Sequence, residues 1–138
     1  MDIKRFIIGT VVGGIAFYIL GYIIWDILVA DFYAANRGSA VGLTKDAPVL
    51  WAAAVGTLAY AALVTLGIGT RAGVTTVMDG AKVGAVVGFL LWLTVNMIFF
   101  AYFNISNLTV TIVDPLLEAV RAGLGGAVIA VVLGKVSG

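Results

Sequence analysis

The stretch Asp114-Pro115-Leu116-Leu117-Glu118-Ala119-Val120-Arg121-Ala122-Gly123-Leu124-Gly125-Gly126 places two acids and a base inside an apolar segment that runs on to Gly134. Asp114, Glu118, Arg121 and Gly125 are spaced at i, i+4, i+7 and i+11. On a helix these positions share one stripe about 60° wide, at roughly 100° per residue. Charged side chains in a bilayer face each other or water rather than lipid. We therefore expect the other spans to be arranged around this stripe.

The composition is that of a membrane protein. Of the 138 residues, 62% are hydrophobic and 11% are charged, whereas a soluble domain is about half apolar and about a quarter charged. A net charge of +1 argues against nucleic acid as a partner, because that requires a clustered basic face. The chain has no Cys and no His, which removes thiolate nucleophiles, disulfides, imidazole bases and the usual zinc and haem ligands. No cofactor and no metal are expected.

Four apolar segments are long enough to cross a bilayer core of about 30 Å. They cover residues 6–30, 49–68, 83–103 and 115–134. The predicted fold is all-α: an integral membrane four-helix bundle with up-down-up-down topology, in a single domain over residues 1–138. Asp114 is predicted to cap the last helix and Pro115 to take its first position. Asn104 and Asn107, just before it, fit the glycosylation pattern, but so short a pattern is a weak signal, and two Asn in a polar turn is the favoured interpretation.

Glycines mark the expected helix contacts. In lipid, small residues let helix backbones approach closely, so Gly80, Gly84 and Gly88 predict a packing seam on the third span. Gly9 and Gly13 predict another on the first span, with Gly126 on the last. The two halves each read as a glycine-seam helix, a loop and a proline-started helix, which is typical of a parallel repeat of two hairpins. Chance matches between low-complexity helices give the same pattern.

The glycines also bear on the oligomeric state. Gly9, Gly13, Gly126 and Gly134 exceed what packing within one small bundle needs, and close packing between copies would use them. A homodimer and a monomer both remain open on this argument. Membrane lipids are the expected partners in either case.

Lys and Arg in the short loops set the expected orientation. With four spans, one side holds Lys4, Arg5, Arg71, Lys82 and Lys135, and the other holds Arg37 and Lys45. This asymmetry predicts that both termini are cytoplasmic in a multi-pass protein of the cell inner membrane.

In this orientation, several polar residues share the outer half of the membrane: Asp26, Asn96, Asp114, Glu118 and Arg121. Tyr18, Tyr22 and Asp26 follow at i, i+4 and i+8 on one face of the first span. Two arrangements remain open for the cluster. It is either a polar pocket that opens outwards, with Tyr18, Tyr22, Trp25 and Trp92 as its walls, or a salt-bridge knot that seals the bundle. A third alternative has Arg121 snorkelling alone to the outer surface.

Two stretches carry a resemblance to a known group. With Gly-Tyr-Ile-Ile-Trp-Asp-Ile-Leu-Val-Ala-Asp-Phe-Tyr at 21–33 and Thr-Ile-Val-Asp-Pro-Leu-Leu-Glu-Ala-Val-Arg-Ala-Gly at 111–123, the chain resembles small four-span bacterial membrane proteins of unknown function. The resemblance implies a fold and a bacterial inner membrane. It supplies no catalytic residues.

Three functions are compatible with these features. The first is a non-enzymatic protein that binds a small amphiphile or lipid in the outward-facing cleft, with Arg121 holding an anionic group and Asp26 and Glu118 setting its polarity. The second is a small, dimeric transporter, which needs an alternately exposed carboxylate near the midplane. The third is a structural or accessory subunit. An enzyme is not expected, because acid–base chemistry would depend on Asp26 or Glu118 alone.

Overall fold

The structure is a computed structural model that describes residues 1–74 and 76–136. Its elements, in chain order, are α1 (Ile3–Gly21), the π-helical segment η1 (Tyr22–Leu28), α2 (Ala30–Ala35), α3 (Leu50–Gly69), α4 (Val77–Tyr102) and α5 (Leu108–Lys135). The helix α1 with η1, and the helices α3, α4 and α5, are long and apolar enough to cross a membrane. These four helices fit a multi-pass integral membrane protein, and the expected all-α four-helix bundle is confirmed.

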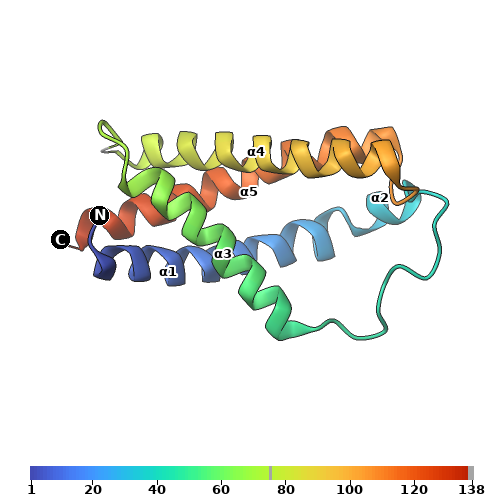
Figure 1. Cartoon of the computed structure of the whole chain (residues 1–138), viewed down its shortest axis with the longest axis horizontal. Coiled ribbons are helices and arrows are strands. Elements are labelled where there is room, and N and C mark those ends of the chain that lie inside the picture. Colours follow the sequence, from blue (N-terminus) through green and yellow to red (C-terminus); the bar gives the residue numbers. More distant parts are fainter. Residues whose placement is uncertain (75, 137–138) are drawn as a thin grey trace.

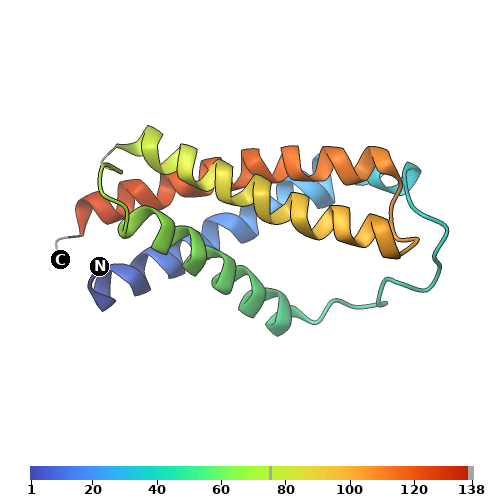
Figure 2. The same ribbon diagram turned by 45° about the horizontal axis from the view of Figure 1, so that its top comes forward.

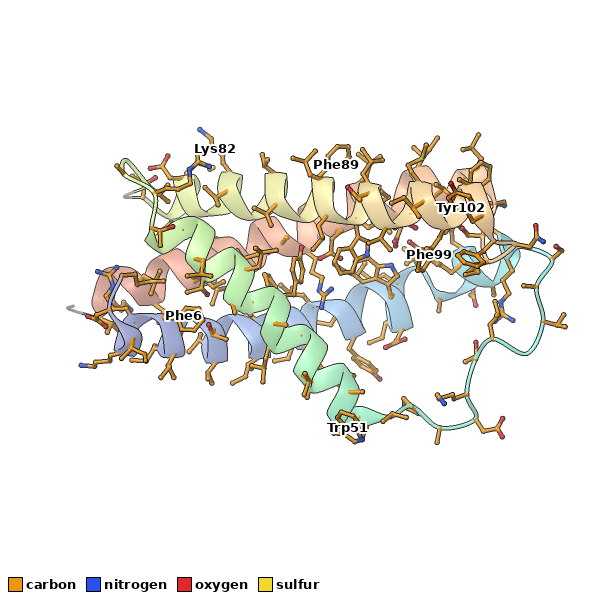
Figure 3. All side chains as sticks on the ribbon, viewed as in Figure 1. Phe6, Trp51, Lys82, Phe89, Phe99 and Tyr102 are labelled. Atoms are coloured by element: carbon orange, nitrogen blue, oxygen red, sulfur yellow. The ribbon has the colours of Figure 1, made fainter. Side chains whose placement is uncertain are left out.

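The helices pack unevenly. Helices α4 and α5 lie side by side along their length, and α1 lies along the other flank of α5 (Figures 1 and 2). Helix α3 packs on α1 near the end that carries both termini and then diverges from the bundle (Figure 1). Residues 50–56 at its diverging end are all exposed, and Trp51 points away from the other helices (Figure 3). The two hairpins, α1–α3 and α4–α5, therefore differ in how far their helices stay together.

A glycine seam holds α4 against α5. A Cβ on Gly84 would collide with the backbone carbonyl of Ala122, and one on Gly126 would collide with the carbonyl of Gly80. A Cβ on Gly88 would lie only 2.5 Å from the Ala122 Cβ. Gly80, Gly84 and Gly88 thus lie where the two backbones approach most closely, as small residues allow between membrane helices.

The glycines of α1 are also used inside the bundle. A Cβ on Gly9 would lie 2.6 Å from Thr65 Cγ2, and one on Gly13 would lie 2.7 Å from Ile129 Cδ1. Four glycines were expected to exceed what packing within one bundle needs: Gly9, Gly13, Gly126 and Gly134. Of these four, only Gly134 has open space around it. The argument from surplus glycines to a homodimer therefore does not hold, and the homodimer stays a prediction without that support.

Two helices begin earlier than predicted. Helix α5 begins at Leu108, where Asn107 Oδ1 accepts a hydrogen bond of 3.0 Å from the Val110 backbone N–H. Pro115 lies within the helix, so the prediction that Asp114 caps it was wrong. Both Asn107 and Asp114 are good caps, and the earlier one is used because the first turn buries Val110.

Helix α4 begins at Val77 rather than at residue 83. Thr76 and Asp79 form a capping box there: the Thr76 hydroxyl accepts from the Asp79 N–H, and an Asp79 carboxylate oxygen accepts from the Thr76 N–H. Reciprocal bonds of this kind satisfy N–H groups that the first turn leaves free. The predicted polar turn over residues 69–82 is shorter as a result.

The long connection after the first span is partly ordered. It contains α2, and beyond α2 its backbone pairs with the α4–α5 loop. The Gly38 N–H donates to the Ile105 carbonyl at 3.0 Å, and the Ala40 N–H donates to the Asn104 carbonyl at 2.9 Å. The Asn107 side-chain amide donates to Asn36 Oδ1 at 3.0 Å. These bonds fix α2 beside the start of α5.

Candidate functional site

Asp114 lies at the centre of a polar cluster that joins three other elements. Trp25 Nε1, from η1, donates to Asp114 Oδ1 at 2.9 Å, and the Tyr33 hydroxyl, from α2, donates to the same oxygen. Asn96 Nδ2, from α4, donates to Asp114 Oδ2 at 2.8 Å. We call these four residues the Asp114 hub. Asp114 itself is 9% exposed, so three neutral donors hold a buried carboxylate.

The hub forms one wall of a cleft of about 420 Å³ at the end of the bundle away from the termini. We call it the Asp114 cleft. Its lining comprises the hub together with Ala30, Ala34, Asn36, Arg37, Phe99, Ile105, Ser106 and Val110. Phe99 points from α4 toward α2 (Figure 3). Arg37 is the one cation among these lining residues. The cleft therefore combines a carboxylate, an arginine and apolar or aromatic walls.

The π-helical segment explains which residues of the first span face the cleft. A π turn closes i→i+5 bonds and so holds more residues than an α turn, which rotates every later side chain relative to a regular helix. Within this segment Trp25 faces Asp114. Tyr18 lies before the segment and Tyr22 is its first residue, and both are exposed, at 45% and 56%. Asp26 is exposed and forms no hydrogen bond or ion pair with residues 1–74 or 76–136. The face predicted to line the pocket through Tyr18, Tyr22 and Asp26 therefore points outward.

Arg121 and Glu118 form a separate centre deeper in the bundle. Glu118 is 0% exposed, and its Oε2 lies 3.3 Å from Arg121 Nη1. Arg121 Nε donates to the Phe17 backbone carbonyl at 3.0 Å. The Arg121 side chain is only 12% exposed, which excludes snorkelling in this structure.

Aromatic rings enclose the guanidinium. Arg121 Cζ lies 5.6 Å from the ring centroids of Phe17 and Trp25 and 5.9 Å from that of Tyr60. These distances fall within the range of cation–π attraction. Gly21 gives the group room, since a Cβ there would lie 3.1 Å from an Arg121 nitrogen. We call Arg121, Glu118 and the three rings the Arg121 centre.

Trp92 belongs to the packing around this centre rather than to the cleft. Its ring lies 5.1 Å from the ring of Tyr60, which in turn stacks on Phe17 at 4.9 Å. The charged residues of α5 therefore have two roles: Asp114 lines the cleft, whereas Glu118 and Arg121 form an ion pair with each other. A cleft and a buried ion pair therefore occur together at different depths. Of the four predicted walls of the pocket, Trp25 lines this cleft, and the outward opening stays a prediction.

Several participants were not singled out from the sequence. They include Tyr33, Arg37 and Phe99 in the cleft, and Phe17 and Tyr60 at the Arg121 centre. Only the aromatic ring and hydroxyl of Tyr33, eight residues after Trp25, offered a signal. Burial, together with the hydrogen bond to Asp114, raises the pKa of Tyr33 above its ordinary range. Tyr33 therefore remains a donor to Asp114 well into alkaline conditions.

The described part of the chain brings together no group of three metal-ligating side chains. Among the described residues that line the cleft, Asp114 is the one carboxylate, so the arrangement suits binding through charge and hydrogen bonds. Comparison with known proteins finds no family model, no curated protein and no solved structure that matches this chain.

Proposed function

We propose that this multi-pass membrane protein binds a small amphiphile in the Asp114 cleft, through a positively charged amine on the ligand. The observation that supports it best is a carboxylate, 9% exposed, which accepts three hydrogen bonds from neutral donors in a cleft of about 420 Å³. Neutral donors hold Asp114 in position without cancelling its charge. An ammonium group supplies the missing opposite charge.

The walls of the cleft favour the same ligand. Trp25, Tyr33 and Phe99 line it, and aromatic faces attract alkylammonium groups. Arg37 lines the cleft as well and suits a phosphate or carboxylate on the same molecule. Arg121, which we first expected to hold an anionic group, is already engaged by Glu118 and Phe17. The preferred ligand is therefore an amine-bearing or zwitterionic amphiphile.

The cleft is proposed to open toward the outside, with both termini cytoplasmic. The support is the excess of Lys and Arg in the segments at the opposite end. Single cysteines at Ser39 and at Ala72, both exposed positions, test this. On intact cells an impermeant thiol reagent should label the first and spare the second. Labelling of Ala72→Cys but not of Ser39→Cys would show that the protein has the opposite orientation.

A transporter and an accessory subunit stay as alternatives. A transporter would use a carboxylate that gains access to both sides. Among the described residues of the spans, Glu118 is an acid with 0% exposure, but it is already paired with Arg121 on the same helix. Uptake of a labelled alkylamine into proteoliposomes that is lost in Glu118→Gln and retained in wild type and in Asp26→Asn would favour transport over simple binding.

The binding experiment compares three twelve-carbon amphiphiles, one with an ammonium, one with a sulfate and one with a neutral sugar headgroup. Each is titrated against the purified protein in mild detergent, and the shift in melting temperature is measured. Dodecylammonium should stabilise wild type at the lowest concentration. Asp114→Asn should weaken its binding about tenfold, as expected for the loss of one charge-assisted contact.

Asp26→Asn is the matched control, because it removes the same charge near the same end of the span from an exposed side chain outside the cleft. It should leave dodecylammonium binding unchanged. If Asp114→Asn folds but binds dodecylammonium as wild type does, the proposal is wrong. Equal weakening in both variants would indicate general charge attraction, which also contradicts it.

A further inference from the structure

A second cavity lies at the opposite end of the bundle, where the termini are. It has a volume of about 250 Å³ and is formed by the ends of α1, α3 and α5, with the loop between α3 and α4. Two arginines line it: Arg5 from the first turns of α1, and Arg71 from the loop just after α3. None of the described residues that line this cavity is acidic. We call it the Arg5–Arg71 cavity.

Neither arginine has a counter-ion in the part of the chain that the structure describes. Within residues 1–74 and 76–136, neither forms an ion pair, and the Arg5 Nε is buried with no hydrogen-bond partner. A buried guanidinium N–H without an acceptor is unfavourable, so an anion that accepts this hydrogen bond would bind favourably in the cavity. Arg71 also lines a neighbouring cavity of about 480 Å³ together with Lys82 and Asp79. The Asp79 carboxylate there is hydrogen-bonded to Thr76 in the helix cap.

We propose that the Arg5–Arg71 cavity binds a phosphate group, and that the phosphate belongs to the headgroup of an anionic phospholipid. Guanidinium groups match phosphate oxygens in a planar, two-point geometry. The cavity lies where four spans end, which is the level of lipid headgroups in a bilayer. Basic pockets between membrane helices commonly take such headgroups. The site is separate from the Asp114 cleft and does not depend on the function proposed for it.

The test measures the melting temperature of the purified full chain in mild detergent against three additions. These are dioleoyl phosphatidylglycerol, dioleoyl phosphatidylcholine and inorganic phosphate. The variant is Arg5→Gln with Arg71→Gln. The control is Lys4→Gln with Lys135→Gln, which removes the same charge from exposed residues at the same end that do not line the cavity. Arg71→Gln alone changes an exposed loop residue and serves if the double variant fails to fold.

Phosphatidylglycerol should raise the melting temperature of wild type and control in a saturable way, and phosphatidylcholine should not. The affinity of the double variant should fall by about tenfold or more, and that of Arg71→Gln alone by about tenfold, the usual effect of losing a hydrogen bond to a charged group. A saturable effect of inorganic phosphate alone, lost in the same variants, would keep the phosphate site but assign it to a free anion. If control and double variant weaken equally, or if neither phosphate source stabilises wild type, the proposal fails.

Discussion

Replacing Arg121 by methionine is the sharpest test of the Arg121 centre. Methionine has a similar length but no charge and no N–H groups. The change removes the Nε bond to the Phe17 carbonyl, at 3.0 Å, and the contacts with three aromatic rings at 5.6–5.9 Å. It also leaves Glu118, which is 0% exposed, without its ion-pair partner.

The contacts that join different helices set the expected magnitude. A hydrogen bond to a charged group contributes about 1.5–3 kcal/mol and a cation–π contact about 0.5–1 kcal/mol or more when desolvated. Because the ion pair with Glu118 is between residues three apart on one helix, it largely persists in an unfolded state whose helices remain intact. One such hydrogen bond and three cation–π contacts together lead us to expect that Arg121→Met lowers the free energy of unfolding by about 3–6 kcal/mol.

The assay is reversible unfolding of the purified protein in mixed micelles by added SDS, followed by circular dichroism. Lys4→Met, an exposed cation on α1, is the control and should change the free energy of unfolding by about 0.5 kcal/mol or less. Adding Glu118→Leu to Arg121→Met should recover about 1–2 kcal/mol, since it removes a buried carboxylate that has lost its partner. Typical couplings between membrane helices are only about 0.6 kcal/mol, so this recovery is measurable above them.

Two results would refute the reasoning. A loss of about 1 kcal/mol or less for Arg121→Met, the value of an exposed pair, would mean that the guanidinium reaches the surface and joins no helices. Additive losses in the double variant would mean that Glu118 and Arg121 are not coupled. The first result would refute the claim that the Arg121 centre joins helices. The second would refute only the coupling between Glu118 and Arg121.

Three further changes test other contacts. Gly84→Leu should lower thermal stability in detergent strongly, because its side chain meets the Ala122 carbonyl, while Gly134→Leu, in open space, should not. A π turn is commonly a local bulge in an α-helix. Deleting Ile23 should therefore remove the extra residue, convert η1 to a regular helix and leave Trp25 facing Asp114, so that dodecylammonium binding is retained. Loss of binding would contradict this account of Trp25. Raising the pH from about 9 to about 11 should destabilise wild type more than Tyr33→Phe, because burial raises the pKa of Tyr33 and the folded state then holds its proton above the ordinary value of about 10.

The number of spans and the charged stripe could be predicted from local sequence. Hydropathy over long windows fixes the spans, and the spacing of Asp114, Glu118 and Arg121 on a helix fixes their shared direction. The four-residue spacing of Gly80, Gly84 and Gly88 likewise identifies the surface of α4 that meets α5. Each of these features depends only on residues within one helix.

The membership of the cleft could not be predicted in the same way. The phase of Trp25 and Asp26 depends on η1, and the apolar residues of this segment read equally well as a regular helix. Tyr33 and Arg37 enter the cleft because the loop that carries them pairs with the α4–α5 loop through the bond from Gly38 to Ile105. Long-range pairing of two loops leaves no periodic signal in either of them.

Charge balance distinguishes the two acids of the stripe more clearly than their spacing does. Glu118 is neutralised by Arg121, and the pair is enclosed by rings and a backbone carbonyl. Within residues 1–74 and 76–136, the side-chain donors to Asp114 are Trp25, Tyr33 and Asn96, none of which carries a positive charge. A buried charge is stable when it is paired, so the unpaired acid beside an open cleft is the one that gains most from a cationic ligand. For the same reason, replacing Glu118 should alter stability, whereas replacing Asp114 should alter which amphiphile binds.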